Sequence, residues 1–258
     1  MSATLNGSVT TILLDVEGTT TPIDFVYQIL FPYARSHAGE FLMRHRSSPD
    51  VRLDLDALYR EHAEDTRQGL NPPMLQNPEE PKSLVPYVDW LIERDRKSTS
   101  LKLLQGKIWA EGYMSGELRS RVFDDVPSAF KRWQQRGKII AIFSSGSVLA
   151  QKLLFAHTMA GDLTGYLSAY FDTTVGAKPD PASYKKIAST LKRSPSEVVF
   201  ISDVVRELVA ADIAGFQTLL CERPGNPPQP SNLHNVIQTF EEVFPEKQAA
   251  RKLPIENR

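Results

Sequence analysis

The chain has little cysteine, and this absence limits where and how the protein folds. Cys221 is the only cysteine among 258 residues, so an internal disulfide is excluded. A secreted scaffold held by disulfides is therefore excluded too, and the reducing cytoplasm is the simplest location. The N-terminal segment shows no basic leader, and the longest stretch without Asp, Glu, Lys or Arg, residues 224–240, holds four prolines. We expect neither a signal peptide nor a membrane span.

An excess of one charge is also lacking. The chain has 30 basic and 31 acidic residues, which gives a formal net charge of −1. This balance gives no general reason to expect nucleic acid as a partner. The chain does contain 41% hydrophobic residues, which is enough to bury a substantial core in one or two domains.

Three short apolar segments end in polar or acidic residues. They are Thr10–Leu14 before Asp15, Lys138–Phe143 before the SSGS of residues 144–147, and Val198–Ser202 before Asp203. Apolar runs of this length predict buried strands. Helical patterns lie between them at Pro127–Arg136, closed by Gly137, and at Pro181–Lys192, with Asp180 as the expected N-cap. This alternation predicts an α/β fold, with a parallel sheet flanked by helices that binds ligands at the carboxyl ends of its strands.

The alternation stops between about Ile23 and Asp124, where the sequence becomes helical and charged. We interpret this part as a helical insertion folded around the proline-rich connection Asn71–Pro86. Leu101, Leu104 and Ile108 form an apolar face on its last long helix, and residues 94–107 add several positive charges. Charges of this kind are by themselves typical of a solvated helix face.

Asp15 and Glu17 form an acidic pair directly after the first predicted strand. A carboxylate there can attack phosphorus or bind a hard cation, and two carboxylates in different surroundings can divide the roles of nucleophile and acid/base. Acidic residues at the start of loops also serve as caps and in Asx turns. The pair alone therefore leaves a structural and a catalytic interpretation equally open.

Three further groups lie at strand ends or helix starts. Ser144 and Ser145 offer hydroxyl and backbone N–H groups for a phosphate, although a plain turn would look the same. Lys178, in GAKPD, can neutralise a phosphoryl group or be an ordinary surface lysine. Asp203, with Glu207 four residues later, can bind a metal or can cap a helix that has Glu207 in its first turns.

The joint pattern is far more specific than any one part. DVEGTT, SSGS, GAKPD and ISDVVREL, in this order, resemble the four motifs of the haloacid dehalogenase-like phosphohydrolases. Within them, LLDVEGTTTPI with Glu17 as its second acid resembles the enolase-phosphatases, or acireductone synthases, of methionine salvage. The likeness extends through FVYQILFPYAR, VDWLIERDRKSTSLKLLQGKIWAEGY and FDDVP. It implies a Rossmann-like core domain of residues 1–23 and 124–258, and an all-helical cap domain of residues 24–123.

The resemblance also implies a role for each motif residue. Asp15 is expected to be the nucleophile that forms an aspartyl-phosphate, and Glu17 the acid/base. Ser144, Ser145 and Lys178 are expected to bind the phosphate of the substrate. One Mg²⁺ per subunit is expected at Asp15, Asp203 and Glu17, the last through its backbone carbonyl. Residues 94–107 with Trp109 and Tyr113 are the cap residues expected to line the site.

The reaction implied is that of a Mg-dependent phosphoric monoester hydrolase. The enzyme would enolise 2,3-diketo-5-methylthiopentyl-1-phosphate and then dephosphorylate it to 1,2-dihydroxy-3-keto-5-methylthiopentene, the acireductone of methionine biosynthesis. The base for enolisation stays open between Glu17 and a cap residue, and so does the group that stabilises the enolate, Mg²⁺ or Lys178. The resemblance further suggests a monomer, and it leaves the nucleus open as a second location beside the cytoplasm.

Two other functions compete with this interpretation. A phosphatase of the same fold acting on another small phosphate ester would keep Asp15, Glu17, Lys178 and Asp203 without any use for enolisation. A non-catalytic protein could use the same fold to bind a phosphorylated ligand or another protein. The intact acidic site argues against this second rival, since a binding module has no need of Asp15.

Overall fold

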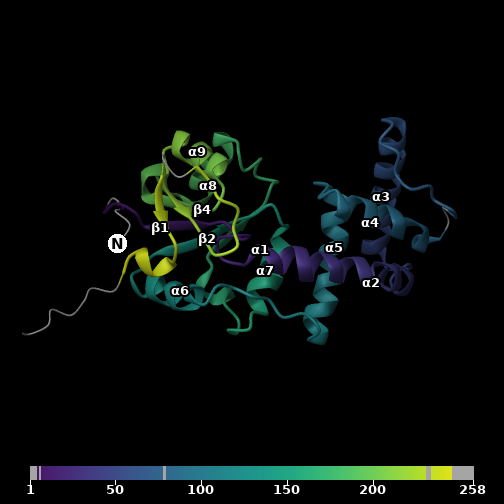
Figure 1. Cartoon of the computed structure of the whole chain (residues 1–258), viewed down its shortest axis with the longest axis horizontal. Helices are drawn as coiled ribbons and strands as arrows, with labels where there is room; N and C mark the ends of the chain where they lie inside the picture. The colour runs from purple at the N-terminus through teal and green to yellow at the C-terminus, as the bar shows by residue number, and fades with distance from the viewer. Residues whose placement is uncertain (1–4, 6, 78–79, 231–233, 246–258) are drawn as a thin grey trace, which may run out of the picture.

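The computed structural model describes residues 5, 7–77, 80–230 and 234–245 of the chain (Figure 1). Within this part, the strands form one parallel six-stranded sheet in the order β3-β2-β1-β4-β5-β6. The strands are β1 (Thr11–Leu14), β2 (Ile139–Phe143), β3 (Ala169–Phe171), β4 (Val198–Ser202), β5 (Gln217–Cys221) and β6 (Asn235–Ile237). The predicted α/β class is confirmed, and the three predicted strands are β2, β1 and β4, which lie next to one another inside the sheet.

Both faces of the sheet are covered by helices. The side chains of β1 point alternately to the two faces, and those on both faces are buried. Ile12 and Leu14 pack on one face, where α6 (Asp125–Gln135) and α7 (Val148–Ala156) contribute apolar side chains to the same core. Leu13 points to the opposite face, which is covered by α8 (Pro181–Leu191) and α9 (Val205–Ile213). The central strands are therefore buried on both sides, which explains why they read as continuous apolar runs.

The segment between β1 and α6 is helical, as predicted. It contains α1 (Ile23–Phe25), a π-helical turn at Val26–Leu30, α2 (Phe31–Arg44), α3 (Pro49–Arg67), α4 (Val85–Glu93) and α5 (Thr99–Ser115). Figure 1 shows α2 to α5 on one side of the molecule and the sheet with α6, α8 and α9 on the other. Leu101, Leu104 and Ile108 of α5 are buried, so this face of the helix packs inside the protein and is not solvated.

Two predicted boundaries change at prolines. The connection predicted for Asn71–Pro86 is already helical from Pro81, in a 3₁₀ turn that runs into α4. Likewise α6 starts at Asp125, two residues before Pro127. Proline is tolerated in the first turn of a helix, where its missing N–H has no intrahelical acceptor. The sequence interpretation therefore placed these starts too late.

The helix ends follow the expected capping chemistry. The carboxylate of Asp180 accepts a hydrogen bond from the backbone N–H of Ala182 at 2.9 Å, so its predicted role as the N-cap of α8 is confirmed. The residue after α8, Lys192, has φ of 54°, and Gly137 after α6 has φ of 67°. Left-handed residues of this kind end helices. In the described part of the chain, no helix has both the length and the apolar character needed to cross a bilayer.

Candidate active site

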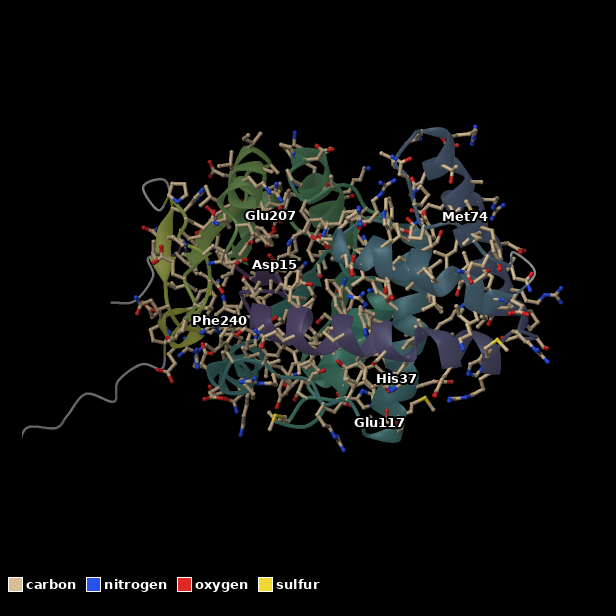
Figure 2. All side chains as sticks on the ribbon, turned by 45° about the vertical axis from the view of Figure 1, so that its right-hand side comes forward. Asp15, His37, Met74, Glu117, Glu207 and Phe240 are labelled. Carbon is tan, nitrogen blue, oxygen red and sulfur yellow. The ribbon has the colours of Figure 1, made fainter. Side chains whose placement is uncertain are left out.

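Three strand ends bring the predicted site residues to one edge of the sheet. Leu14 at the end of β1 is paired with Ile142 of β2 on one side and with Ile201 of β4 on the other. Asp15, Ser144 and Asp203 follow these strands, so they leave the sheet at the same edge. Parallel strands bind ligands at this edge. Figure 2 shows Asp15 and Glu207 near one another in the α/β part, and Met74 far from them.

The Asp15 carboxylate is buried and held at both oxygens. Its Oδ1 accepts a hydrogen bond from the backbone N–H of Val16 at 2.7 Å and lies 2.6 Å from Nζ of Lys178. Its Oδ2 accepts a hydrogen bond from Oγ of Ser202 at 3.0 Å. Asp15 is 3% exposed, so little water competes with these contacts. The arrangement fixes one carboxylate in a single orientation, as a nucleophile requires.

Lys178 is as buried as Asp15 and bridges two carboxylates. Its Nζ lies 2.6 Å from Oδ1 of Asp15 and also 2.6 Å from Oε2 of Glu207. Burial lowers the pKa of Lys178, but the negative charges of Asp15 and Glu207 outweigh it, so the pKa lies above its usual value. The ammonium therefore stays charged. The surface-lysine alternative is wrong, because Lys178 is only 5% exposed.

Glu207 is a site residue that the sequence interpretation treated only as part of a helix start. Besides Lys178, its Oε2 lies 3.2 Å from Oγ of Ser202, which also contacts Asp15. Burial, followed by the charge of Asp15, raises the pKa of Glu207 to about 7. The signal was its place four residues after Asp203, one turn into the helix, on the side facing the strand end.

Asp203 lies beside Asp15 but keeps one oxygen without a partner. Its backbone N–H donates to Oγ1 of Thr19 at 3.1 Å, and its Oδ2 accepts a hydrogen bond from Nδ2 of Asn226 at 3.2 Å. Oδ1 is buried and has no hydrogen-bond partner among the described residues. Burial, followed by the charge of Asp15, raises the pKa of Asp203 to about 7.

The alternative role of Asp203 as a helix cap is wrong. The N-cap of α9 is Val204, and no side chain caps this helix. Asn226 instead ties Asp203 to the loop after β1, because its Nδ2 also donates to the carbonyl of Gly18 at 2.8 Å. Sequence reasoning missed Asn226, which lies in a proline-rich stretch without any pattern that points to the site.

Glu17 and the predicted phosphate loop lie on the other side of Asp15. Oγ of Ser144 donates to Oε2 of Glu17 at 3.4 Å and accepts from the backbone N–H of Gly146 at 3.0 Å. Burial, followed by the charge of Asp15, raises the pKa of Glu17. The carboxyl group is therefore biased toward its protonated form, as a proton donor requires.

A cavity joins this edge of the sheet to the helical segment. The core contributes Glu17 and the loop of residues 144–147 to its wall. The helical side contributes mainly apolar side chains together with a few polar ones: Val26, Leu30, Phe31, Leu91, Ile92, Asp95, Arg96, Lys97, Leu101, Lys102, Gln105 and Trp109. The cavity thus has a polar end at Glu17 and the loop of residues 144–147, and a largely apolar end under the helices.

The cap residues expected to line the site are only partly found there. Trp109 does line the cavity, and its Nε1 donates to the carbonyl of Leu30 at 2.8 Å. Tyr113 does not, because its ring stacks on His157 and its hydroxyl accepts from Ser120. The basic residues within 94–107 are also only partly found there. Arg96, Lys97 and Lys102 line the cavity. Arg94 lies outside it, over the ring of Trp90 at 4.4 Å from the ring centroid.

The donor set suits a hard cation with many water ligands. Among the described residues, no group of three or more His, Cys, Asp or Glu side chains is placed to hold a metal. Mg²⁺ needs fewer, because it keeps several waters and takes one or two carboxylates. Asp15 and Asp203 supply two, and the unpartnered Oδ1 of Asp203 is a buried acceptor without a protein donor. The site therefore fits Mg²⁺ and does not fit a cation that demands an all-protein shell.

Comparisons with known proteins find similar sequences along most of the chain. The family model of haloacid dehalogenase-like hydrolases matches residues 9–215. A protein of Synechococcus elongatus named "Enolase-phosphatase E1" is 51% identical over 236 residues, covering 92% of this chain and 98% of that protein. The protein of the same name from Drosophila grimshawi is 45% identical over 228 residues, covering 88% of this chain and 91% of its own length.

Solved structures show the same fold. The UTR4 protein of Saccharomyces cerevisiae superimposes with a TM-score of 0.72 and 35% sequence identity, covering 90% of this chain and 99% of its own. CbbY from Rhodobacter sphaeroides in complex with phosphate gives a TM-score of 0.56 at 16% identity, covering 92% of this chain and 97% of its own. At that identity the second likeness concerns the fold alone.

Proposed function

Because the chain belongs to the haloacid dehalogenase-like hydrolases and, within them, to the enolase-phosphatases, we propose that it enolises 2,3-diketo-5-methylthiopentyl-1-phosphate and then removes the phosphate. The product is 1,2-dihydroxy-3-keto-5-methylthiopentene, an intermediate of methionine salvage. The observation that carries this proposal is the buried contact of Asp15 with Lys178 at 2.6 Å. The two residues after Asp15, Val16 and Glu17, line a cavity that is largely apolar on its helical side.

Asp15 attacks the phosphorus atom of the ester. The new bond joins a carboxylate oxygen of Asp15 to phosphorus, and the bond between phosphorus and the ester oxygen breaks. Lys178, with its charge kept by two carboxylates, neutralises the transferring group. Ser144 and Ser145 at the start of the loop before α7 bind the phosphate through hydroxyl and N–H groups. Water then cleaves the aspartyl-phosphate.

Glu17 is the proton carrier in this scheme. Its raised pKa lets the carboxyl group give a proton to the leaving ester oxygen, after which the carboxylate takes a proton from the attacking water. Glu17 lines the same cavity as the apolar helix residues, which would put it within reach of the carbon atom that carries the phosphate ester. Enolisation breaks a C–H bond at that carbon and places a proton on the oxygen of the neighbouring ketone. We assign both proton transfers to Glu17, which takes the proton in its ionised form, passes it to that oxygen, and is protonated again from solvent before phosphate transfer.

One Mg²⁺ per subunit completes the proposed site. Asp15, Asp203 and the backbone carbonyl of Glu17 would hold it, and the unpartnered Oδ1 of Asp203 supports this assignment. When bound, the ion supplies positive charge for the phosphoryl oxygens. Asp203 itself is oriented by Asn226 and Thr19, which contact its Oδ2 and backbone N–H.

The wider organisation follows from the same family resemblance. We propose residues 1–23 and 124–258 as the core domain and residues 24–123 as the cap domain, which excludes water and contacts the organic end of the substrate. The enzyme would act as a monomer in the cytoplasm, with the nucleus as a second location. Its partner is a small phosphorylated molecule.

An anaerobic assay of the purified protein with the diketo phosphate and Mg²⁺ tests the proposal. Ultraviolet absorbance follows the enolised species, while released phosphate is measured in the same sample. We expect both signals to rise and both to require Mg²⁺. Hydrolysis of a simple phosphomonoester without any change in the diketo phosphate would leave the chemistry of Asp15 intact and overturn the substrate assignment.

A further inference from the structure

Helix α5 buries an amide side chain among apolar neighbours. Gln105 is 4% exposed, in a helix whose buried face also carries Leu101, Leu104 and Ile108. None of the described residues forms a hydrogen bond with the Gln105 side chain. Buried polar groups are nearly always hydrogen-bonded, because the lost contact with water is otherwise uncompensated. The amide atoms of Gln105 are not among the fully buried atoms that lack a partner, so they keep some accessible surface in the cavity that Gln105 lines.

The unpaired amide faces the active-site cavity. Gln105 lines this cavity together with Glu17 and Ser145. The next residue, Gly106, brings the helix close to the phosphate loop: a Cβ atom there would lie 3.7 Å from Oγ of Ser147 and 3.3 Å from Cδ2 of Leu149. Helix α5 therefore approaches the phosphate loop one residue after Gln105, and Gln105 lines the same cavity as Ser144 and Ser145.

We propose that Gln105 determines specificity for the dicarbonyl group of the substrate, with Nε2 donating a hydrogen bond to a ketone oxygen. This inference rests on the function proposed above. It explains why α5 tolerates an unpaired amide: the partner arrives with the substrate. The bond also strengthens as the ketone oxygen gains negative charge during enolisation, because a charged acceptor binds a donor more tightly.

The other groups around the cavity suit other parts of the substrate. The serine loop suits the phosphate, and the apolar side chains of the helices suit the methylthio end. Two lysines on the helical side already have polar neighbours: Lys97 contacts both carboxylate oxygens of Asp95 at 2.8 Å, and Nζ of Lys102 lies 3.5 Å from Oγ1 of Thr173. A neutral ketone oxygen can accept a hydrogen bond from a neutral amide, and Gln105 supplies this amide.

The test is the variant Gln105→Leu, which keeps the side-chain size and removes the amide. Gln135→Leu is the matched control, because Gln135 is exposed at the end of α6. Steady-state kinetics are measured with the diketo phosphate and with 1-pentyl phosphate, which has a five-carbon chain and no ketone. Calorimetry measures binding of a 2,3-diketoalkyl phosphonate and of the matching alkyl phosphonate, and thermal unfolding is recorded without ligand.

For Gln105→Leu we expect kcat/KM for the diketo phosphate to fall about 10- to 100-fold, as for loss of one hydrogen bond to a ligand. Activity on 1-pentyl phosphate should stay within about twofold, and Tm should equal or exceed that of the unsubstituted protein. The diketo phosphonate should lose affinity while the alkyl phosphonate does not.

Equal losses for both substrates, or no loss for either, overturn the assignment of Gln105 while the proposed function stands. If the unsubstituted enzyme fails to turn over the diketo phosphate yet hydrolyses 1-pentyl phosphate, the proposed function fails and this inference falls with it. The two failures are therefore distinguished by the unsubstituted protein alone.

Discussion

Nζ of Lys178 lies 2.6 Å from Oδ1 of Asp15, with both side chains almost fully buried. The ammonium also contacts Glu207 at the same distance, so one positive charge serves two carboxylates at the bottom of the site. Buried charges of this kind are tolerated only when they are paired. Lys178 therefore links catalysis to stability, and removing its charge should affect both.

Lys178→Met should lower both activity and stability. The substitution leaves the carboxylates of Asp15 and Glu207 buried beside each other without a cation, which costs about 3–5 kcal/mol of unfolding free energy. The rate of phosphate release should fall at least about 10²- to 10³-fold, as for removal of a group that neutralises transition-state charge. Chemical denaturation and kinetics measure the two effects, with Lys185→Met, at an exposed position of α8, as the control.

The loss of stability in Lys178→Met should be smaller at pH 5 than at pH 8. Protonation of Glu207, whose pKa is already raised to about 7 by burial and by Asp15, removes one of the two unpaired charges at the lower pH. A loss that is the same at both pH values, or an unfolding free energy equal to that of the control, would contradict a structural role for this ion pair.

Asp15→Asn should abolish turnover and keep the fold. The amide oxygen can still accept from Val16 and Lys178, and the amide nitrogen can donate to Oγ of Ser202, so the local contacts survive. Loss of the nucleophile should reduce phosphate release by at least about 10⁴-fold. Rapid quenching with ³²P-labelled substrate should trap a phosphoprotein only in the unsubstituted enzyme. Turnover within tenfold of normal would exclude Asp15 as the nucleophile.

Residues at strand ends could be predicted from the sequence, and residues that reach the site by packing could not. Asp15, Ser144 and Asp203 each follow an apolar run, and parallel strands place their carboxyl ends at one edge. Glu207 carries only a weaker signal, its place one helical turn after Asp203, and Asn226 carries none. Asn226 reaches the site only because its loop returns to Gly18, a residue 208 positions away in the chain.

In the helical segment, too, the sequence predicts the elements but does not predict how they pack. Its helical character is visible in the sequence, but which face of α5 is buried depends on α2, α3 and α7, against which α5 packs. Gln105 therefore looks like an ordinary polar helix residue in the sequence and becomes informative only once its burial is known. Short edge strands such as β3 and β6, three residues each, were not predicted because their patterns are too brief to distinguish from loops.

Mg²⁺ should stabilise the protein more at pH 8 than at pH 5.5. Burial, then the charge of Asp15, raises the pKa of Asp203 from 3.8 to about 7. In the metal-free protein, the stability contributed by this group is fully present below about pH 3.8 and is lost as the pH rises through about 7. Each pH unit of this range costs up to about 1.4 kcal/mol.

Metal binding reverses this cost, because it requires the ionised carboxylate. Thermal unfolding at the two pH values, with and without Mg²⁺, measures the effect. Asp203→Asn should remove both the shift caused by Mg²⁺ and its dependence on pH. An equal Mg²⁺-induced rise in Tm at pH 5.5 and pH 8 would show that the metal does not bind through Asp203.

Gly18→Ala should weaken Mg²⁺ binding, because Gly18 lies directly against the carboxylate of Asp203. A Cβ atom at Gly18 would lie 2.2 Å from Oδ2 of Asp203 and 3.0 Å from Nδ2 of Asn226, so the carboxylate has to move. Gly18 also has φ of 72°, which costs an alanine about 1 kcal/mol of backbone strain. Strain alone, however, does not predict any change in metal affinity.

Gly116→Ala separates the two effects. Gly116 has φ of 82° at the end of α5, and a Cβ atom there would meet nothing within 4 Å. Both variants should therefore lose about 1 kcal/mol of stability from strain, but only Gly18→Ala should bind Mg²⁺ more weakly, by about tenfold or more for loss of one well-placed ligand. Calorimetric titration with Mg²⁺ measures this difference. Equal affinities in the two variants would mean that the contact between Gly18 and Asp203 does not position the metal ligand.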